Sequence, residues 1–170
     1  MGWRGFPGLL KAAVLTWTLG IVLGLTVFAV PGAHVDLHKT QPAPTAWGIF
    51  STNLRVLAGC LLGLVTFSLA SFTTLMLNGI LLGIQWRIFT AHASGWKVLA
   101  LIAPHGVLEV PGMLLAGAVG MMGAAALRCF ARTPAQGTRF CALPALAAVA
   151  VSLVLTLLGA LVEAWNIARL

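Results

Sequence analysis

Charged residues are scarce in this chain, and tyrosine is absent. Asp and Glu together number 3 among 170 residues, against 10 Lys and Arg. A charged share of 8% and a hydrophobic share of 60% leave too little polar surface to coat a soluble globule. Mean hydropathy is +1.02. The composition therefore predicts an integral membrane protein, whose surroundings are the lipid bilayer.

The motifs that indicate cofactor or metal chemistry are also missing. The 3 cysteines form no Cys-x-x-Cys or Cys/His pattern, so neither structural zinc nor a disulfide framework is predicted. There is no Walker A motif and no His-Glu-x-x-His motif. His34 and His38 flank Asp36 in a short polar loop, where we expect solvated side chains rather than metal ligands. We expect no metal, no cofactor and no catalytic residue.

Two further classes are disfavoured by what the sequence lacks. Serine hydrolysis inside the membrane would need an embedded serine beside a base; His105 is available, but Ser68 and Ser71 lie at an expected turn and no nucleophile elbow is present. The net charge of +7 comes from basic residues dispersed at segment ends, without the basic and aromatic clusters that bind nucleic acid. We therefore expect neither an enzyme nor a nucleic-acid partner.

Length and hydropathy predict an all-α bundle of about five transmembrane helices in a single domain, residues 1–170. The apolar stretch 50–92 would form a helix of about 60 Å, twice the hydrocarbon thickness, so it must fold back near its Ser/Thr cluster. The start could be read as a secretory signal, but its long apolar run favours a retained first span. The expected spans are 9–30, 51–70, 73–91, 104–127 and 143–163, with the main polar loop at 32–47.

A break is expected before the fourth span. Residues 96–127 would form a helix of about 48 Å, too long for one crossing. Pro104 and Pro111 each remove a backbone donor, and the expected break consists of Pro104, Gly106 and Pro111. We predict a short interfacial or re-entrant helix over 96–103, then a span that begins at Pro104 and is kinked near Pro111.

Small residues recur at helical spacing in nearly every span. Because lipid gives helices no hydrophobic reason to associate, close backbone approach through small residues is how spans pack. The predicted packing residues are Gly20, Gly24, Gly59, Gly63, Gly79, Gly83, Gly117 and Gly120. The favoured interpretation is packing within one bundle; the alternative is that the pair Gly20 and Gly24 faces a second subunit.

A few polar residues lie at membrane depth, where a carboxylate costs roughly 2.5–3.5 kcal/mol on insertion scales and needs a partner or water. The predicted polar intramembrane site consists of Asn53, Asn78, His105, Glu109 and Glu163. In a structural interpretation Glu109 accepts hydrogen bonds from Asn53 or Asn78 and fixes helix register. In a functional one Glu109 and His105 line a cavity for a cation, a proton or a peptide segment.

An ordered set of motifs resembles the stage II sporulation protein M family over about residues 50–170. The set comprises Ser51-Thr52-Asn53-Leu54-Arg55, Gly59-x-x-x-Gly63, Asn78-Gly79-x-x-x-Gly83, Pro104-His105-Gly106-x-x-Glu109, Ala116-Gly117-x-x-Gly120 and Gly159-x-x-x-Glu163-Ala164. Thr52 departs from the pattern, since the family often has a second Asn there. The resemblance implies a five-span bacterial inner-membrane protein without established catalytic activity, which recruits cell-wall-degrading partners or accompanies an ATPase in bacteriocin export or immunity.

The leading functional hypothesis is a scaffold or subunit of a larger membrane assembly. Its partners would be other membrane proteins, among them an ATPase, a cell-wall-related protein or a second copy of the chain. The alternative is a transporter or permease-like component, because broken helices with polar groups near the midplane recur in transporters. Arg128, Arg132 and Arg139 form the most basic connection, which the positive-inside bias places in the cytoplasm. The prediction is a multi-pass inner-membrane protein with a cytoplasmic N-terminus.

Overall fold

The architecture is a bundle of helices. A computed structural model describes residues 5–27, 45–92, 94–132 and 142–167, and every regular element in these ranges is helical. In chain order the elements are α1 (Phe6–Thr26), α2 (Ala46–Leu61), the short 3₁₀ helix η2 (Leu62–Leu64), α3 (Leu69–His92), α4 (Gly95–Gly120), α5 (Met122–Arg132) and α6 (Ala142–Ile167).

Five segments are long and apolar enough to cross a membrane, which confirms the predicted all-α membrane bundle. They are Phe6–Thr26, Ala46–Leu64, Leu69–Ala91, Gly106–Arg128 and Leu143–Asn166. The second span begins five residues earlier than expected because Thr45 caps it: the Thr45 hydroxyl accepts a hydrogen bond from the Gly48 amide at 3.1 Å. Most of the predicted polar loop 32–47 lies outside the described residues.

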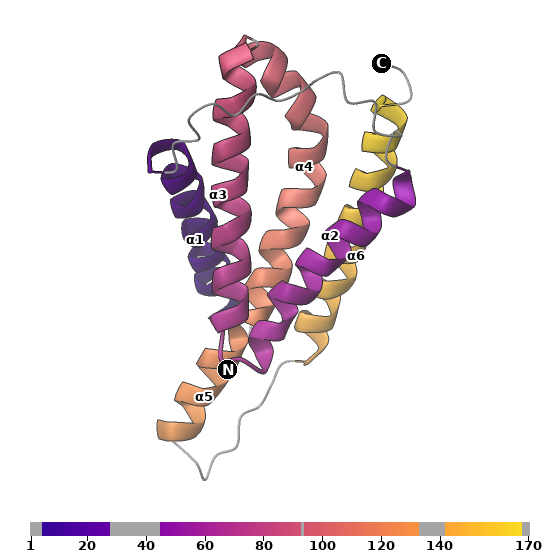
Figure 1. Cartoon of the computed structure of the whole chain (residues 1–170). Helices are drawn as coiled ribbons and strands as arrows, with labels where there is room; N and C mark the ends of the chain where they lie inside the picture. Colours follow the sequence, from indigo (N-terminus) through magenta and orange to yellow (C-terminus); the bar gives the residue numbers. More distant parts are fainter. Residues whose placement is uncertain (1–4, 28–44, 93, 133–141, 168–170) are drawn as a thin grey trace.

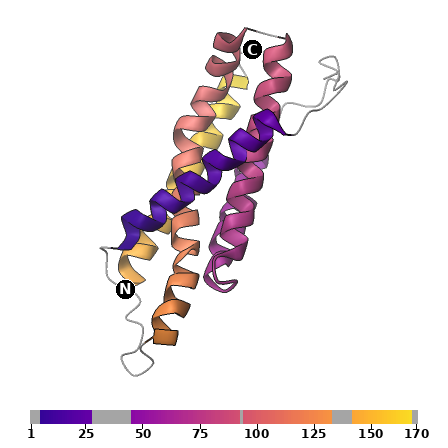
Figure 2. The same ribbon diagram turned by 90° about the vertical axis from the view of Figure 1, so that its left-hand side faces the viewer.

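Helix α4 lies at the centre of the bundle (Figure 1), with α1 and α3 on one side and α2 and α6 on the other. Within its span 56% of the residues are buried, against 22–28% in the other four. Successive spans alternate in direction, so α1 begins and α6 ends at opposite ends of the bundle (Figures 1 and 2). Helices α2 and α3 meet at a tight turn and diverge away from it.

The turn between α2 and α3 lies at 65–68, slightly earlier than the sequence indicated. Of the Ser/Thr cluster that suggested the turn, Ser68 lies in it, and Ser71, Thr73 and Thr74 lie in α3. Phe67 and Ser68 adopt positive φ values of 51° and 77°, an uncommon conformation for residues with a side chain. The Ser68 amide donates to the Gly63 carbonyl at 2.7 Å. This geometry reverses the chain directly after η2.

The predicted break before the fourth span is wrong. Helix α4 runs without interruption from Gly95 to Gly120, through Pro104, Gly106 and Pro111, so residues 96–103 form its first turns rather than a separate re-entrant helix. An interior proline costs roughly 3 kcal/mol because it removes one hydrogen bond and crowds one carbonyl. Membrane helices tolerate that cost where neighbouring helices surround them. Pro111 itself is exposed, so the cost is offset by the packing of the rest of this central span, which is the most buried of the five, rather than by contacts of the proline ring.

The helix is interrupted later in the sequence, at Met121, which separates α4 from α5. The Ser68 hydroxyl bridges this junction: it donates to the Met121 carbonyl at 2.9 Å and accepts from the Ala124 amide at 3.2 Å. Glycine allows the approach, because a Cβ at Gly120 would lie 1.9 Å from the Cys60 carbonyl oxygen. The α2–α3 turn therefore packs directly against the α4–α5 junction.

Helices α1 and α3 cross at a point where each helix presents glycines to the other. A Cβ at Gly20 would lie 2.4 Å from the Met76 carbonyl oxygen, and one at Gly79 would lie 2.3 Å from the Trp17 carbonyl oxygen. Gly24 and Gly83 show the same relation one turn further along. The structure therefore places the pair Gly20 and Gly24 against α3 of the same chain, and the face proposed for a second subunit is filled from within.

Candidate functional site: a polar pocket beside Glu109

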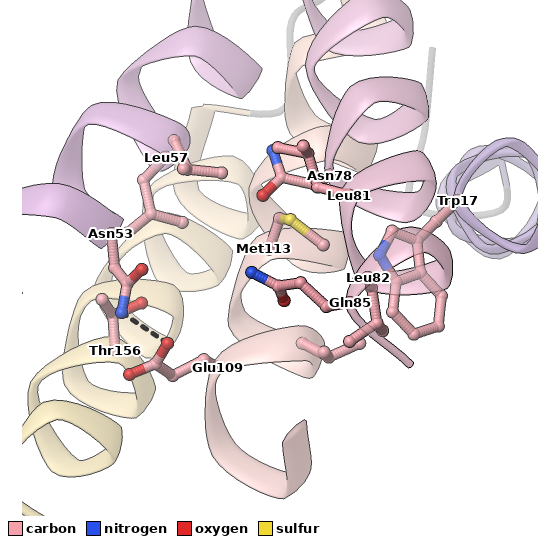
Figure 3. Close-up of a pocket in the computed structure, with 12 residues that line it drawn as sticks. Trp17, Asn53, Leu57, Asn78, Leu81, Leu82, Gln85, Glu109, Met113 and Thr156 are labelled. Atoms are coloured by element: carbon pink, nitrogen blue, oxygen red, sulfur yellow. Dashed lines mark hydrogen bonds between the residues drawn. The ribbon is translucent and has the colours of Figure 1, made fainter. Parts of the chain in front are cut away.

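Glu109 lies inside the bundle, on the central helix. Its side chain is 6% exposed, and one carboxylate oxygen, Oε2, accepts a hydrogen bond from the Nδ2 atom of Asn53 on α2. Figure 3 shows this contact as a dashed line between the two side chains. The pair joins α2 to α4 across 56 residues of sequence. A carboxylate at membrane depth is thus turned inward, away from acyl chains, as the cost of its exposure to lipid requires.

Glycine on α6 makes room for this carboxylate. A Cβ at Gly159 would lie 2.4 Å from Cγ of Glu109 and 2.9 Å from its Oε1. Both distances are far shorter than an ordinary van der Waals contact. The Glu109 side chain is therefore enclosed between Asn53 on α2 and the bare backbone of α6 at Gly159.

A pocket of about 200 Å³ lies beside Glu109. Figure 3 shows the polar side chains of its wall pointing toward one another from different helices. The lining side chains are Trp17 of α1; Asn53, Val56 and Leu57 of α2; Asn78, Leu81, Leu82 and Gln85 of α3; Glu109, Val110 and Met113 of α4; and Thr156 of α6. Water in the liquid occupies about 30 Å³ per molecule, so the space can hold several waters.

Two polar residues of the pocket, Glu109 and Gln85, lie toward one end of their candidate spans. Glu109 is three residues inside the start of its span at Gly106, and Gln85 is six residues before the end of its span at Ala91. At 1.5 Å per residue these positions lie about 5 and about 9 Å from the span ends. Leu81 is 57% exposed and Gln85 is also exposed, so the pocket reaches the outside of the bundle along α3.

The predicted polar residues do not all converge. Asn53 and Glu109 are in contact, and Asn78 lines the same pocket, although its Nδ2 atom donates to the Thr74 carbonyl of its own helix at 2.9 Å. Glu163 lies one turn beyond Gly159 on α6, partly buried, and is not part of the pocket wall. His105 precedes Glu109 by one turn of α4, and its side chain lies outside the described residues.

The other predicted packing glycines lie at helix contacts. A Cβ at Gly59 would lie 2.8 Å from the Thr74 hydroxyl, and one at Gly63 would lie 1.8 Å from the Ser71 hydroxyl. Gly117 faces Leu75, with 2.7 Å to its Cδ1. Gly106 is different, since nothing comes within 4 Å of the position of its Cβ. Gly106 therefore serves neither a close contact nor a break in the helix.

Sequence reasoning did not assign Gly159, Thr156 and Trp17 to the site. Thr156 is 1% exposed and lies one helical turn from Ser152, which is also 1% exposed. Hydroxyls four residues apart in a span that is otherwise almost wholly apolar mark the inward face of α6, and Gly159 extends that face. This spacing was available in the sequence. Trp17 carried no comparable pattern, because its contribution depends on how α1 crosses α3.

Among the side chains that the structure describes, the arrangement offers three hydrogen-bonding amides, one hydroxyl and one acid. Among the described residues, no three His, Cys, Asp or Glu side chains come together as metal ligands. Cys60, the cysteine whose side chain is described, is buried apart from the pocket, and its carbonyl accepts from the Ser71 hydroxyl at 2.5 Å. The geometry is that of a binding pocket or a packing device.

Comparison with known proteins decides the family. The sequence model for stage II sporulation protein M matches residues 13–166, nearly the whole chain. This chain belongs to the stage II sporulation protein M family. The match extends the resemblance seen from residue 50 onward back into α1, and it includes every helix that lines the pocket.

A curated relative is an uncharacterized protein of Methanocaldococcus jannaschii, 34% identical over 73 residues. The match covers 42% of this chain and 41% of the relative, so the chain spans about two fifths of that protein's length. No solved structure matches. The comparisons thus establish a membrane-protein family that is not a known enzyme family.

Proposed function

We propose that this protein is a non-enzymatic scaffold, or a subunit of a larger assembly, in the cell inner membrane. The observation that carries the proposal is the Asn53–Glu109 pair enclosed by Gly159, because these groups join α2, α4 and α6 into one unit. The costly acid of the membrane core is used here to fix helix packing. The four outer spans leave most of their residues unburied within the chain, which gives partner helices broad faces to contact.

Partner contact is tested by photo-crosslinking in the membrane. A photoreactive amino acid is placed at one exposed position on each of three outer spans: Leu15 on α1, Leu77 on α3 and Leu157 on α6, which are 69%, 58% and 45% exposed. We expect at least one position to give an adduct with another membrane protein or with a second copy of the chain. The matched control is Leu75, which is 0% exposed and should give none. Adducts with lipid alone at all three positions would contradict the scaffold.

The role of the acid is tested by Glu109→Gln, which keeps hydrogen-bonding capacity and removes charge. A scaffold carrying this substitution should retain its crosslinked partners and its abundance, because Gln can still pair with Asn53. The same variant also addresses the second candidate function, a transporter or permease-like component. That candidate is favoured by the pocket, which brings a carboxylate and three side-chain amides together inside the bundle. It loses support from the continuous α4, since the expected broken helix is absent.

The proposed orientation has the N-terminus in the cytoplasm. The start of α1 and the whole of α5 lie at the same end of the bundle, as Figure 1 shows, and α5 contains Arg128 and Arg132, two of the three basic residues of the stretch that the positive-inside bias places in the cytoplasm. The C-terminal end of α6 then faces outward. Alkaline phosphatase fused after Leu170 should be active and green fluorescent protein fused there should be dark; the reverse pattern would invert the topology.

A further inference from the structure

The described side chains that line the pocket beside Glu109 include an acid and several amides, and no Lys or Arg. Its described side chains contain one carboxylate, three carboxamides and one hydroxyl, contributed by Asn53, Asn78, Gln85, Glu109 and Thr156. No Lys or Arg is among them. The remaining walls are aliphatic or thioether side chains and the indole of Trp17. Among the described side chains, the wall thus offers an acid and several amide oxygens as acceptors and no Lys or Arg, which makes it complementary to a cation that has N–H groups.

The dimensions favour an organic cation over a bare metal ion. A metal ion needs several oxygens converging at about 2.0–2.6 Å, whereas here the polar groups are spread around about 200 Å³ and alternate with Leu57, Leu82 and Met113. Pockets for drug-sized ligands measure about 300–1,000 Å³, so a ligand of this pocket is smaller than a drug-sized molecule. In Figure 3 Glu109 lies on one side of the pocket and Trp17 on the other, so a charged head and a short apolar body have separate surfaces to contact.

We propose that this pocket binds a small organic monocation, a primary alkylammonium, with its ammonium group at Glu109. The ammonium donates to the carboxylate and to the neighbouring amide oxygens, and the alkyl chain packs against the aliphatic wall. Entry is along α3, where Leu81 is 57% exposed and Gln85 is exposed. The proposal does not depend on the scaffold role, because binding is a property of the isolated chain.

The test is calorimetric titration of the purified full chain in mild detergent with n-butylammonium chloride. Two probes of similar size serve as controls: n-butanol, which lacks the charge, and sodium butyrate, which reverses it. We expect saturable binding of butylammonium, and at least tenfold weaker binding of both controls. Equal uptake of butanol and butylammonium would show partition into micelles and would overturn the proposal, as would the absence of saturable butylammonium binding.

Variants locate the site. Glu109→Gln should weaken butylammonium binding at least tenfold, whereas Glu163→Gln, which removes a carboxylate outside the pocket wall, should leave it within twofold. Leu82→Phe provides a second test that keeps the acid, because the larger ring fills the pocket from α3 and should also abolish binding. Circular dichroism and gel filtration establish that each variant is folded. Full binding by folded Glu109→Gln, or equal losses in Glu109→Gln and Glu163→Gln, would overturn the assignment.

Discussion

The contact between Gly159 and Glu109 predicts that Gly159→Ala destabilises the protein when the Glu109 side chain is present and stabilises it when that side chain is removed. In Gly159→Ala the new methyl carbon would lie 2.4 Å from Cγ of Glu109, whereas carbon atoms in contact are about 3.5–4.0 Å apart. Either α6 or the Glu109 side chain must move by about 1 Å. The side chain is buried and held by Asn53, so it cannot simply turn into open space.

The expected magnitude has two opposing parts. Overpacking of a buried contact costs about 1–3 kcal/mol, and displacement of the carboxylate also weakens its hydrogen bond from Asn53. Alanine is favoured over glycine in a helix interior by about 1 kcal/mol. The weakened hydrogen bond and the helix preference for alanine, each about 1 kcal/mol, roughly cancel, so we expect Gly159→Ala to lower the free energy of unfolding by about 1–3 kcal/mol. In a Glu109→Ala background the obstacle is gone, and the same substitution should raise the free energy of unfolding by about 0.5–1 kcal/mol.

The measurement is equilibrium unfolding in mixed micelles, followed by circular dichroism as denaturing detergent is added, for the four members of the double-mutant cycle. The matched control is Gly106→Ala on α4, where nothing lies within 4 Å of the new methyl group. That control should be stabilising by about 0.5–1 kcal/mol in both backgrounds. If Gly159→Ala destabilises the protein equally with and without the Glu109 side chain, the steric reasoning is refuted.

Three other perturbations test the packing. Gly20→Ala and Gly79→Ala should each lower the free energy of unfolding by about 1–3 kcal/mol. The double variant should lose less than the sum, because moving α1 and α3 apart once relieves both clashes; strictly additive losses in the same unfolding assay would contradict a shared crossing. Ser68→Ala should lower the free energy of unfolding by about 1–3 kcal/mol, because the Met121 carbonyl and the Ala124 amide lose their shared partner. An unchanged midpoint of thermal unfolding would show that the α4–α5 junction does not depend on this hydroxyl. Pro111→Ala should raise the free energy of unfolding by about 1–3 kcal/mol by restoring a backbone donor to a helix that is already continuous, and a loss of stability would mean that the bundle requires the proline ring.

Much of the fold could be predicted from composition and spacing. The apolar runs define five spans because the hydrocarbon core sets their length, and this constraint acts on each segment separately. The inward orientation of Glu109 was also predictable, since lipid penalises a carboxylate wherever the helix lies. The pairing of Asn53 with Glu109 was one of two expected pairings, and the sequence could not choose between Asn53 and Asn78.

The sequence by itself determined that this chain is a helical membrane bundle with an acid turned inward, because hydropathy and charge are properties of single segments. Only the tertiary structure decided that α4 continues through Pro104 and Pro111, since its neighbours supply the packing that offsets the helix-breaking cost. The tertiary structure likewise decided that Gly20 and Gly24 contact α3 and that Gly159 accommodates Glu109. These contacts depend on how two helices cross. A crossing is decided by both helix surfaces together, so neither segment of sequence predicts it alone.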